Sequence, residues 1–218
     1  MSFHLLFEDE LKGFYKSKVM LVLWVGLPLL TLIIYLATPN IQDTSMASFS
    51  AIVIGSIGGM LAAAMLVSSI IGEKNRHVYD LFVIRPVKRS DIVLSKFLAT
   101  FISVIAACAL ALVFGVLFDL TRNGSLPADS FSNSVNALIL AVSMTAIACS
   151  AGVLIGFLAN TMLVGIVLVI YGANQLSAIA ALPGLILPNE PMLPLIPGVI
   201  LTTILLAISV FIFNRKQL

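Results

Sequence analysis

The sequence predicts an all-α, polytopic membrane protein with six transmembrane helices. Of its 218 residues, 60% are hydrophobic and only 10% are charged, whereas soluble domains carry about 25% charged residues. Uncharged apolar runs of about 20 residues recur along the chain, and a helix of that length spans the hydrocarbon layer of about 30 Å. The charged residues gather between these runs. A water-soluble fold could not bury this much apolar surface.

Six apolar runs are assigned as spans of a single transmembrane domain, residues 1–218. The assigned spans are residues 19–38, 48–72, 92–118, 134–158, 162–182 and 198–213. Only residues 159–161 separate the fourth span from the fifth, which predicts a tight helical hairpin. No cleavable signal peptide is expected, because acidic residues precede the first apolar run and that run is too long.

Residues 1–18 predict an amphipathic helix. Phe3, Phe7, Leu11 and Phe14 recur at steps of three and four, which places them on one helical face. Such a helix is expected to lie in the membrane interface. The alternative interpretation is an ordinary polar tail.

The segment before the sixth span is apolar but rich in proline. It holds five of the nine prolines of the chain: Pro183, Pro188, Pro191, Pro194 and Pro197. Proline removes a backbone donor and clashes with the preceding turn, so no continuous helix is expected there. A broken apolar backbone at the membrane edge indicates a re-entrant or interfacial segment.

The distribution of basic residues predicts the topology. With both termini in the cytoplasm, the inner segments hold eleven of the twelve Lys and Arg residues, and only Arg122 lies outside. Cytoplasmic loops carry an excess of Lys and Arg. We therefore expect a multi-pass protein of the plasma membrane with cytoplasmic N and C termini.

The sequence lacks the common catalytic and metal-binding motifs. It has no Walker-type GxxxxGK[ST], no HExxH and no cysteine cluster. No catalytic, cofactor or metal residues are therefore assigned, and no enzymatic activity is expected of this chain. Cys108 and Cys149 lie within apolar runs and are expected to be small buried side chains.

Ionisable residues are missing from the middle of the spans. Lys96 lies near the start of the third span, and its side chain is expected to extend to the lipid headgroups. Transporters that use ion coupling usually need titratable groups within the membrane. This pattern argues against a transporter driven by its own ion coupling.

Two pairs of residues within the spans are candidates for function. Gly55 and Gly59 form a GxxxG pair, which permits close helix contact. Asn174 and Gln175 are the most polar adjacent pair in the spans. They could line a substrate path or form interhelical hydrogen bonds, and the sequence does not separate these two interpretations.

Residues 73–96, EKNRHVYDLFVIRPVKRSDIVLSK, form the long charged interruption of the chain and hold six of its twelve basic residues. Val78, Leu81 and Phe82 share one face of a short predicted helix, which Pro86 ends. This helix could transmit force from a soluble partner to the second and third spans. The alternative is a solvated basic loop that only fixes the topology.

The same stretch resembles the loop after the second span of type-2 ABC transporter permeases, whose pattern is EKExGTLExLLxxPVSRxExLLGKxL. The matching positions are Glu73, Lys74, Pro86, Val87, Arg89 and Lys96, with Asp80 and Asp91 in place of glutamates, and Leu81 lies in the apolar stretch between them. The sequence departs from the pattern at Asn75, His77, Val78, Lys88 and Ser95. The layout of the whole chain is also similar to that of the family.

The resemblance implies a permease subunit that exports a hydrophobic or amphipathic substrate and is driven by a separate ABC ATPase. ATP and Mg²⁺ would bind that partner, which would dock on the cytoplasmic coupling loop, residues 73–91. The coupling residues implied are Glu73, Val78, Tyr79, Asp80, Leu81, Phe82, Arg85 and Pro86. A second permease copy is implied, in a homodimer or a related heterodimer, with Gly55, Gly59, Asn174 and Gln175 near the path or the dimer contact.

Two rival functions remain at this stage. One is a membrane scaffold or assembly protein without a transport path. The other is a small membrane enzyme acting on lipids, which would need clustered Asp, His or Ser residues at one membrane face. Besides the protein partners, only the lipid bilayer is expected to bind, and no nucleic acid.

Overall fold

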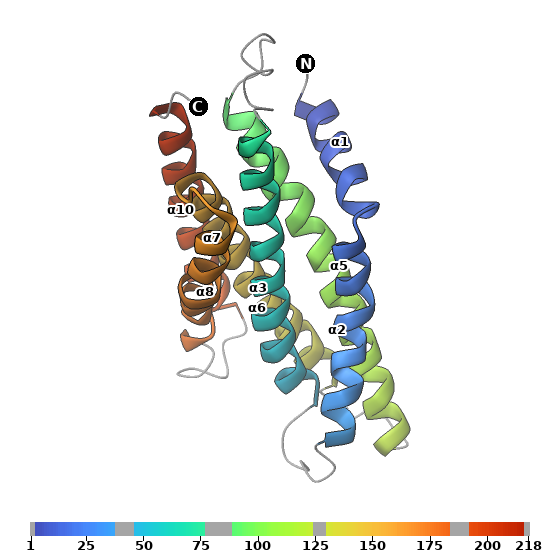
Figure 1. Cartoon of the computed structure of the whole chain (residues 1–218). Helices are drawn as coiled ribbons and strands as arrows, with labels where there is room; N and C mark the ends of the chain where they lie inside the picture. Colours follow the sequence, from blue (N-terminus) through green and yellow to red (C-terminus); the bar gives the residue numbers. More distant parts are fainter. Residues whose placement is uncertain (1–2, 38–45, 77–88, 124–129, 184–191, 216–218) are drawn as a thin grey trace.

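The computed structural model describes residues 3–37, 46–76, 89–123, 130–183 and 192–215. It is almost entirely helical, at 93%, and the described residues form no strand. The longer helices run along a common axis and form an elongated bundle (Figure 1). The all-α prediction is therefore confirmed.

The N-terminal segment forms two helices, α1 (Phe3–Tyr15) and α2 (Lys18–Ala37), with a bend of 61° between them. Leu6 and Phe14 are the buried residues of α1, and α1 packs against α5 (Arg89–Asn123). Phe7 and Leu11 are partly buried against the same core. The predicted helix is confirmed, whereas its position in the membrane interface stays a prediction.

The centre of the bundle is the pair of helices α3 (Met46–Asn75) and α6 (Ser130–Leu158), which pack closely along their lengths. Glycine makes this close approach possible. A Cβ atom added at Gly152 would lie only 2.7 Å from the Cα atom of Ala63. Any side chain at position 152 would therefore push the two backbones apart.

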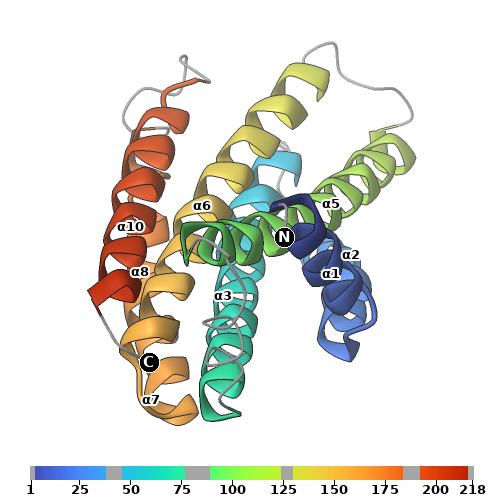
Figure 2. The same cartoon turned by 90° about the horizontal axis from the view of Figure 1, so that it is seen from above.

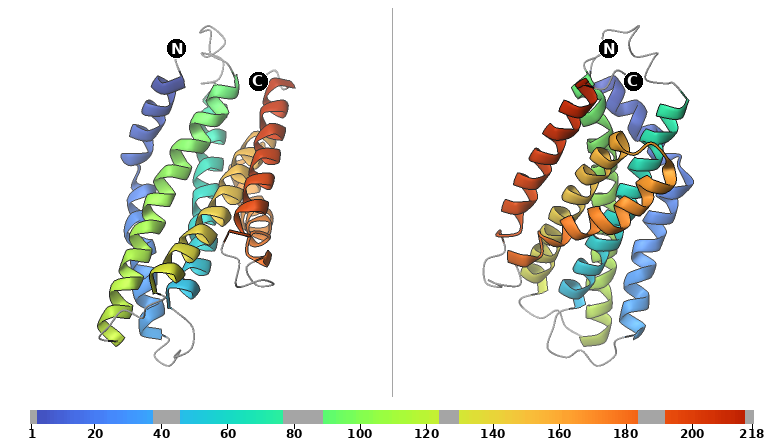
Figure 3. Two further views of the ribbon diagram at one scale, coloured as in Figure 1. Left: turned by 180° about the vertical axis from the view of Figure 1, so that it is seen from behind. Right: turned by 60° about the vertical axis from the view of Figure 1, so that its left-hand side comes forward.

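The predicted hairpin is present, because α6 ends at Leu158 and α7 (Met162–Leu168) begins after three residues. The chain continues as a π-helical turn, η1 (Val169–Ala173), and then α8 (Asn174–Ala178). This segment packs against both α3 and α6 (Figure 3). The fifth predicted span is therefore interrupted by a π turn.

The last described helix, α10 (Leu195–Arg215), packs mainly against α6 at the side of the bundle (Figure 2). Near its C-terminus the ring of Phe213 lies 4.7 Å from that of Phe157, centroid to centroid. Pro197 lies in the first turn of α10, where a missing N–H does not break the helix. Most of the proline-rich segment lies outside the described residues.

Four helices of the described chain are long and apolar enough to cross a membrane: Ile52–Asn75, Ser90–Phe118, Val135–Leu158 and Leu195–Arg215. The bent pair α1 and α2 makes a fifth if it counts as one span, while Met162–Ala178 is a shorter apolar helix. The structure therefore supports four to five spans by length and composition, and the count of six stays a prediction.

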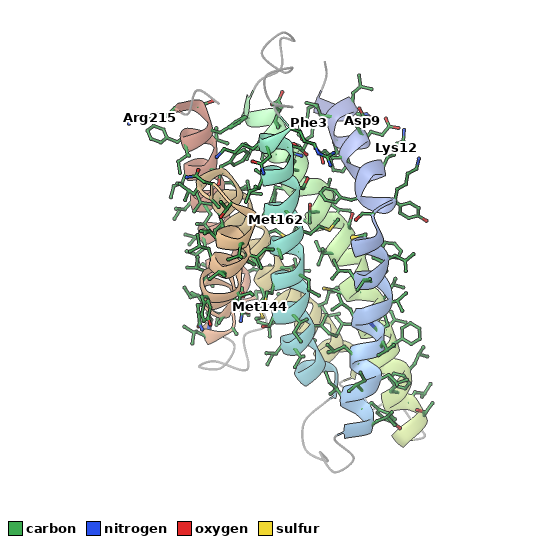
Figure 4. All side chains as sticks on the ribbon, viewed as in Figure 1. Phe3, Asp9, Lys12, Met144, Met162 and Arg215 are labelled. Atoms are coloured by element: carbon green, nitrogen blue, oxygen red, sulfur yellow. The ribbon has the colours of Figure 1, made fainter. Side chains whose placement is uncertain are left out.

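One end of the bundle, which we call the loop end, carries the beginning of α1, the end of α3, the beginning of α5 and the end of α10 (Figure 1). Charged side chains such as Asp9, Lys12 and Arg215 lie at this end, whereas Met144 lies far from it (Figure 4).

Candidate functional site

A buried lysine joins three helices near the loop end. Lys96 of α5 donates hydrogen bonds from Nζ to Glu10 Oε1 of α1 at 2.6 Å and to Glu73 Oε1 of α3 at 2.5 Å. Both contacts are also ion pairs. We call these three residues the Lys96 cluster. The cluster fixes the end of α3 to α1 and to α5.

The burial of Lys96 sets the energetics of the cluster. Its side chain is 1% exposed, whereas those of Glu10 and Glu73 are 24% and 25% exposed. A buried ammonium group is costly unless it is paired and hydrogen-bonded. The carboxylates of Glu10 and Glu73 supply that pairing, and both stay partly exposed. The ammonium group is therefore held in place by both acidic residues together.

Lys96 corrects one expectation from the sequence. Its side chain does not extend to the lipid headgroups but points into the protein, so that prediction was wrong. The physical reason is that Glu10 and Glu73 offer charge-assisted hydrogen bonds inside the bundle. The apolar neighbours Val93 and Phe97 on the same helix are buried too, so this face of α5 is turned toward the core.

A serine on α3 helps to hold Glu73 in position. Ser69, one turn earlier on α3, donates a hydrogen bond to Glu73 Oε1 at 3.2 Å. The same oxygen therefore accepts from both Ser69 and Lys96. Two donors on one carboxylate oxygen restrict the rotamer of the Glu73 side chain.

The next residue on α3 makes a second link. Lys74 Nζ donates to Asn160 Oδ1 at 3.4 Å, and Asn160 lies in the short connection between α6 and α7. Glu73 thus connects the end of α3 to α5 and, through Lys96, to α1. Lys74 connects the same helix end to the α6–α7 connection. These two residues begin the coupling loop expected from the sequence.

Of the coupling residues expected from the sequence, the structure places Glu73 alone. The others, Val78, Tyr79, Asp80, Leu81, Phe82, Arg85 and Pro86, lie outside the described residues. Their docking role stays a prediction. The described residues show that hydrogen bonds of Glu73 and Lys74 connect the base of this loop to the bundle.

Asn174 and Gln175 lie in different environments. Ser56 of α3 donates a hydrogen bond to Asn174 Oδ1 at 3.0 Å, directly after the π turn, whereas Gln175 is exposed. Asn174 therefore makes the interhelical hydrogen bond that the sequence left as one of two alternatives. A lining role for either residue stays a prediction.

Gly55 and Gly59 lie on the face of α3 that packs against α6. An added Cβ atom at Gly55 would lie 3.1 Å from Ala141 Cα, and one at Gly59 would lie 3.0 Å from Ala148 Cβ. Both glycines are buried within the chain. They permit close packing of α3 and α6. Their role at a substrate path or dimer contact stays a prediction.

The exposed face of α1 carries an ordinary surface pair. Lys12 Nζ lies 2.7 Å from Glu8 Oε1, one helical turn away. The hydrogen bond and charge of Lys12 lower the pKa of Glu8, and Glu8 in turn raises the pKa of Lys12. Exposed pairs of this kind contribute little to stability. Of these α1 charges, Glu10 is the one that pairs with the buried Lys96 of α5, so it has the larger structural role.

Sequence reasoning missed the role of Glu10 completely. A usable signal was present, because a lone lysine inside an apolar run needs an acidic partner at a similar depth. In the predicted topology, Glu10 and Glu73 both lie beside the cytoplasmic ends of apolar segments.

Among the described residues, no group of three or more His, Cys, Asp or Glu residues could hold a metal ion.

The chain matches a known protein family. Residues 25–214 match a family model described as ABC-2 family transporter protein. The match covers most of the chain, from α2 to the last turn of α10. The comparison with curated proteins gave no match.

Proposed function

Because the chain belongs to the ABC-2 family of transporter proteins, we propose that it is the permease half of an ATP-driven exporter for a hydrophobic or amphipathic substrate. The family assignment makes the chain a membrane-embedded permease subunit and implies an ABC ATPase partner. The direction of transport, the class of substrate and the docking surface are parts of the proposal.

The Lys96 cluster is the observation that carries the proposal. The coupling loop follows Glu73, and Glu73 is bound to Lys96 of α5, which also binds Glu10 of α1. Lys74 connects the same helix end to Asn160 before α7. A push on the loop by a closing ATPase would therefore move α1, α3, α5 and the α6–α7 connection together.

The low charge of the spans supports an apolar or amphipathic substrate. Apart from Lys96, the buried polar side chains within the described helices are Ser and Thr residues, which most often donate to carbonyls of their own helix. A charged cargo would need counter-charges along its path, because charge is costly within the membrane. We therefore infer a path suited to neutral or amphipathic molecules.

A second copy of the permease completes the proposed transporter. Large apolar side chains on α7 and η1 are exposed, including Leu163 and Tyr171, both at 73%. Gln175 is exposed along the same segment, while Asn174 faces Ser56. These features support a path or dimer contact beside α3 and α8, in a homodimer or a related heterodimer.

We propose that the protein lies in the plasma membrane with its loop end facing the cytoplasm. The basic residues of the chain gather in the segments at that end. A reporter fused after Leu218 should read cytoplasmic, and one inserted near Asn123 should read external. The opposite reading at either site would overturn the orientation.

The experiment that tests the function uses co-expression with a candidate ABC ATPase subunit. The double variant Val78→Asp/Phe82→Asp should lose ATPase binding and transport, because charge would replace the apolar face of the proposed coupling helix. The control variant is Asn75→Gln, at an exposed position on the same side of the bundle. If the double variant binds the ATPase and transports as the wild type does, the docking assignment fails.

The scaffold alternative gives a different result in the same system. A scaffold could bind an ATPase without changing its rate of hydrolysis. A permease should change that rate when its substrate or its partner copy is present. Binding with no change in hydrolysis under any substrate tested would favour the scaffold over the transporter.

A further inference from the structure

A cavity of about 210 Å³, partly open to the surface of the bundle, lies among α5, α6 and α10. Its walls include Phe97 and Phe101 of α5, Ala146 of α6, and Gly198 and Thr202 of α10. The two phenylalanine rings are stacked, 5.4 Å apart between centroids. None of its lining residues belongs to the Lys96 cluster or is Ser56 or Asn174, so the following inference does not depend on the transport proposal.

Thr202 is the anomaly in this cavity. A buried Ser or Thr in a helix usually donates its hydroxyl to a carbonyl of the preceding turn. Two neighbours in the lining do so, because Ser143 donates to Ile139 O at 2.8 Å and Thr203 donates to Val199 O at 2.9 Å. Thr202 is 8% exposed, and its Oγ1 atom has no hydrogen-bond partner among the described residues.

An unsatisfied buried hydroxyl beside a cavity needs a physical explanation, because each such group is costly. A water molecule is a poor occupant, since ordered waters need two to four polar partners. The surface that lines the cavity is almost entirely apolar, so a water would find few polar partners there. A molecule that brings an apolar body and a single polar group fits the lining better.

The lining also limits the charge and size of such a molecule. It contains no Asp, Glu, Lys, Arg or His residue. An ionised ligand would therefore lose its hydration without gaining a counter-charge. An apolar cavity of about 150 Å³ is already large enough to bind benzene, so this one can hold a somewhat longer molecule.

We propose that this cavity is a binding site for a small, uncharged amphiphile with one hydroxyl group, of the alkanol or alkylphenol class. The apolar body packs against Phe97, Phe101 and Ala146, and the ligand hydroxyl pairs with Thr202. A rotation of the Thr202 side chain by about 120°, from one staggered rotamer to another, moves the hydroxyl to another of the three positions on Cβ, from which it can pair with the ligand.

The test uses the purified full-length chain in detergent and the photoactivatable alcohol 3-azioctanol. Labelled peptides are identified by mass spectrometry, and competition by 1-octanol gives an apparent Kd. We expect labels on the segments of α5, α6 and α10 that line the cavity. Labels found only elsewhere on the chain would overturn the proposal.

Three variants make the test specific. Thr202→Val keeps the shape and removes the hydroxyl, and should raise the apparent Kd for octanol about threefold to tenfold. Thr203→Val is the matched control, because its hydroxyl is already bonded to Val199 O and Ile200 O, and should change the Kd less than twofold. Ala146→Phe fills the cavity and should abolish labelling of the lining.

A diazirine-bearing octane without the hydroxyl separates the proposal from simple occupancy by hydrocarbon. Its labelling should be the same in the wild type and in Thr202→Val, and should be lost in Ala146→Phe. If Thr202→Val binds octanol as tightly as the wild type, the cavity accepts any hydrocarbon chain and the proposed hydroxyl recognition is wrong. This comparison stands even if Ala146→Phe does not fold.

Discussion

The Nζ atom of Lys96 lies 2.5 Å from Oε1 of Glu73, so a cation from the second turn of α5 holds a carboxylate in the last turn of α3. These two residues bracket the charged loop in sequence. Their contact closes the base of the loop, and Glu10 extends the same contact to α1. The loop therefore leaves the bundle from a fixed base formed by three helices.

Replacing the buried ammonium group should destabilise the protein strongly. Lys96→Met leaves two carboxylates facing each other without a cation, and loss of one partner from a buried pair costs about 3–5 kcal/mol. Because both carboxylates are about a quarter exposed, we expect the lower end, about 3 kcal/mol, and a Tm lower by about 6–12 °C. Thermal unfolding of the purified protein in detergent measures this.

The control for Lys96→Met is Lys12→Met, which removes an exposed lysine from the surface pair with Glu8. Its Tm should stay close to that of the wild type. Equal losses of Tm in the two variants would mean that the Lys96 cluster is no more important than a surface pair.

Glu10 and Lys96 should be energetically coupled although they are 86 residues apart in sequence. We expect the double variant Glu10→Gln/Lys96→Met to be less destabilised than the sum of the two single variants, with a coupling energy of about 1–3 kcal/mol. A double-mutant cycle built on unfolding midpoints measures it. Additive effects would show that the ion pair between α1 and α5 does not form in the membrane protein.

The packing of α3 on α6 should depend on Gly152. Gly152→Ala places a Cβ atom 2.7 Å from the Ala63 backbone, so the helices must separate, at a cost of about 1–3 kcal/mol. Gly26→Ala is the matched control, because an added Cβ atom there meets nothing within 4 Å. That control should leave stability unchanged or raise it slightly, since alanine favours the helix. Similar losses at both positions would argue against close contact at Gly152.

Asn174 offers a test that separates structure from transport. Ser56→Ala removes the hydrogen bond to Asn174, and such bonds in membranes are worth about 0.6 kcal/mol on average. We expect a small change in Tm for Ser56→Ala and for Asn174→Ala. If Asn174 also lines the path, Asn174→Ala should change the transport rate several-fold while Ser56→Ala does not. Equal rates in both variants would limit Asn174 to its structural hydrogen bond.

The helices and the short hairpin could be predicted from the sequence because they depend on local patterns. Apolar runs of sufficient length gave α3, α5, α6 and α10, and the three residues between α6 and α7 required a tight turn. The count of six spans stays a prediction, since the structure supports four to five by length and composition. The 61° bend after α1 and the π turn in the fifth apolar run depend on packing that hydropathy does not report.

The Lys96 cluster could not be predicted from local patterns because its members come from three helices. Lys96 pairs with a residue 86 positions away, and only the packing of α1 on α5 brings Glu10 within reach. The resemblance to a transporter family was found from residues 73–96, and the match over residues 25–214 confirmed it. The role of Glu10 lies outside that motif.

The π turn Val169–Ala173 sets the angular phase of everything that follows it in the fifth apolar run. A π turn accommodates one more residue than an α turn, and each residue of an α-helix advances the side chains by about 100°. If the same residues formed an unbroken α-helix, Asn174 would lie about 100° around the helix axis, away from Ser56. Deleting a single residue such as Gly172 should instead turn the π turn into an α turn and keep Asn174 facing Ser56. The one extra residue in the π turn therefore keeps the Asn174 side chain facing Ser56 of α3.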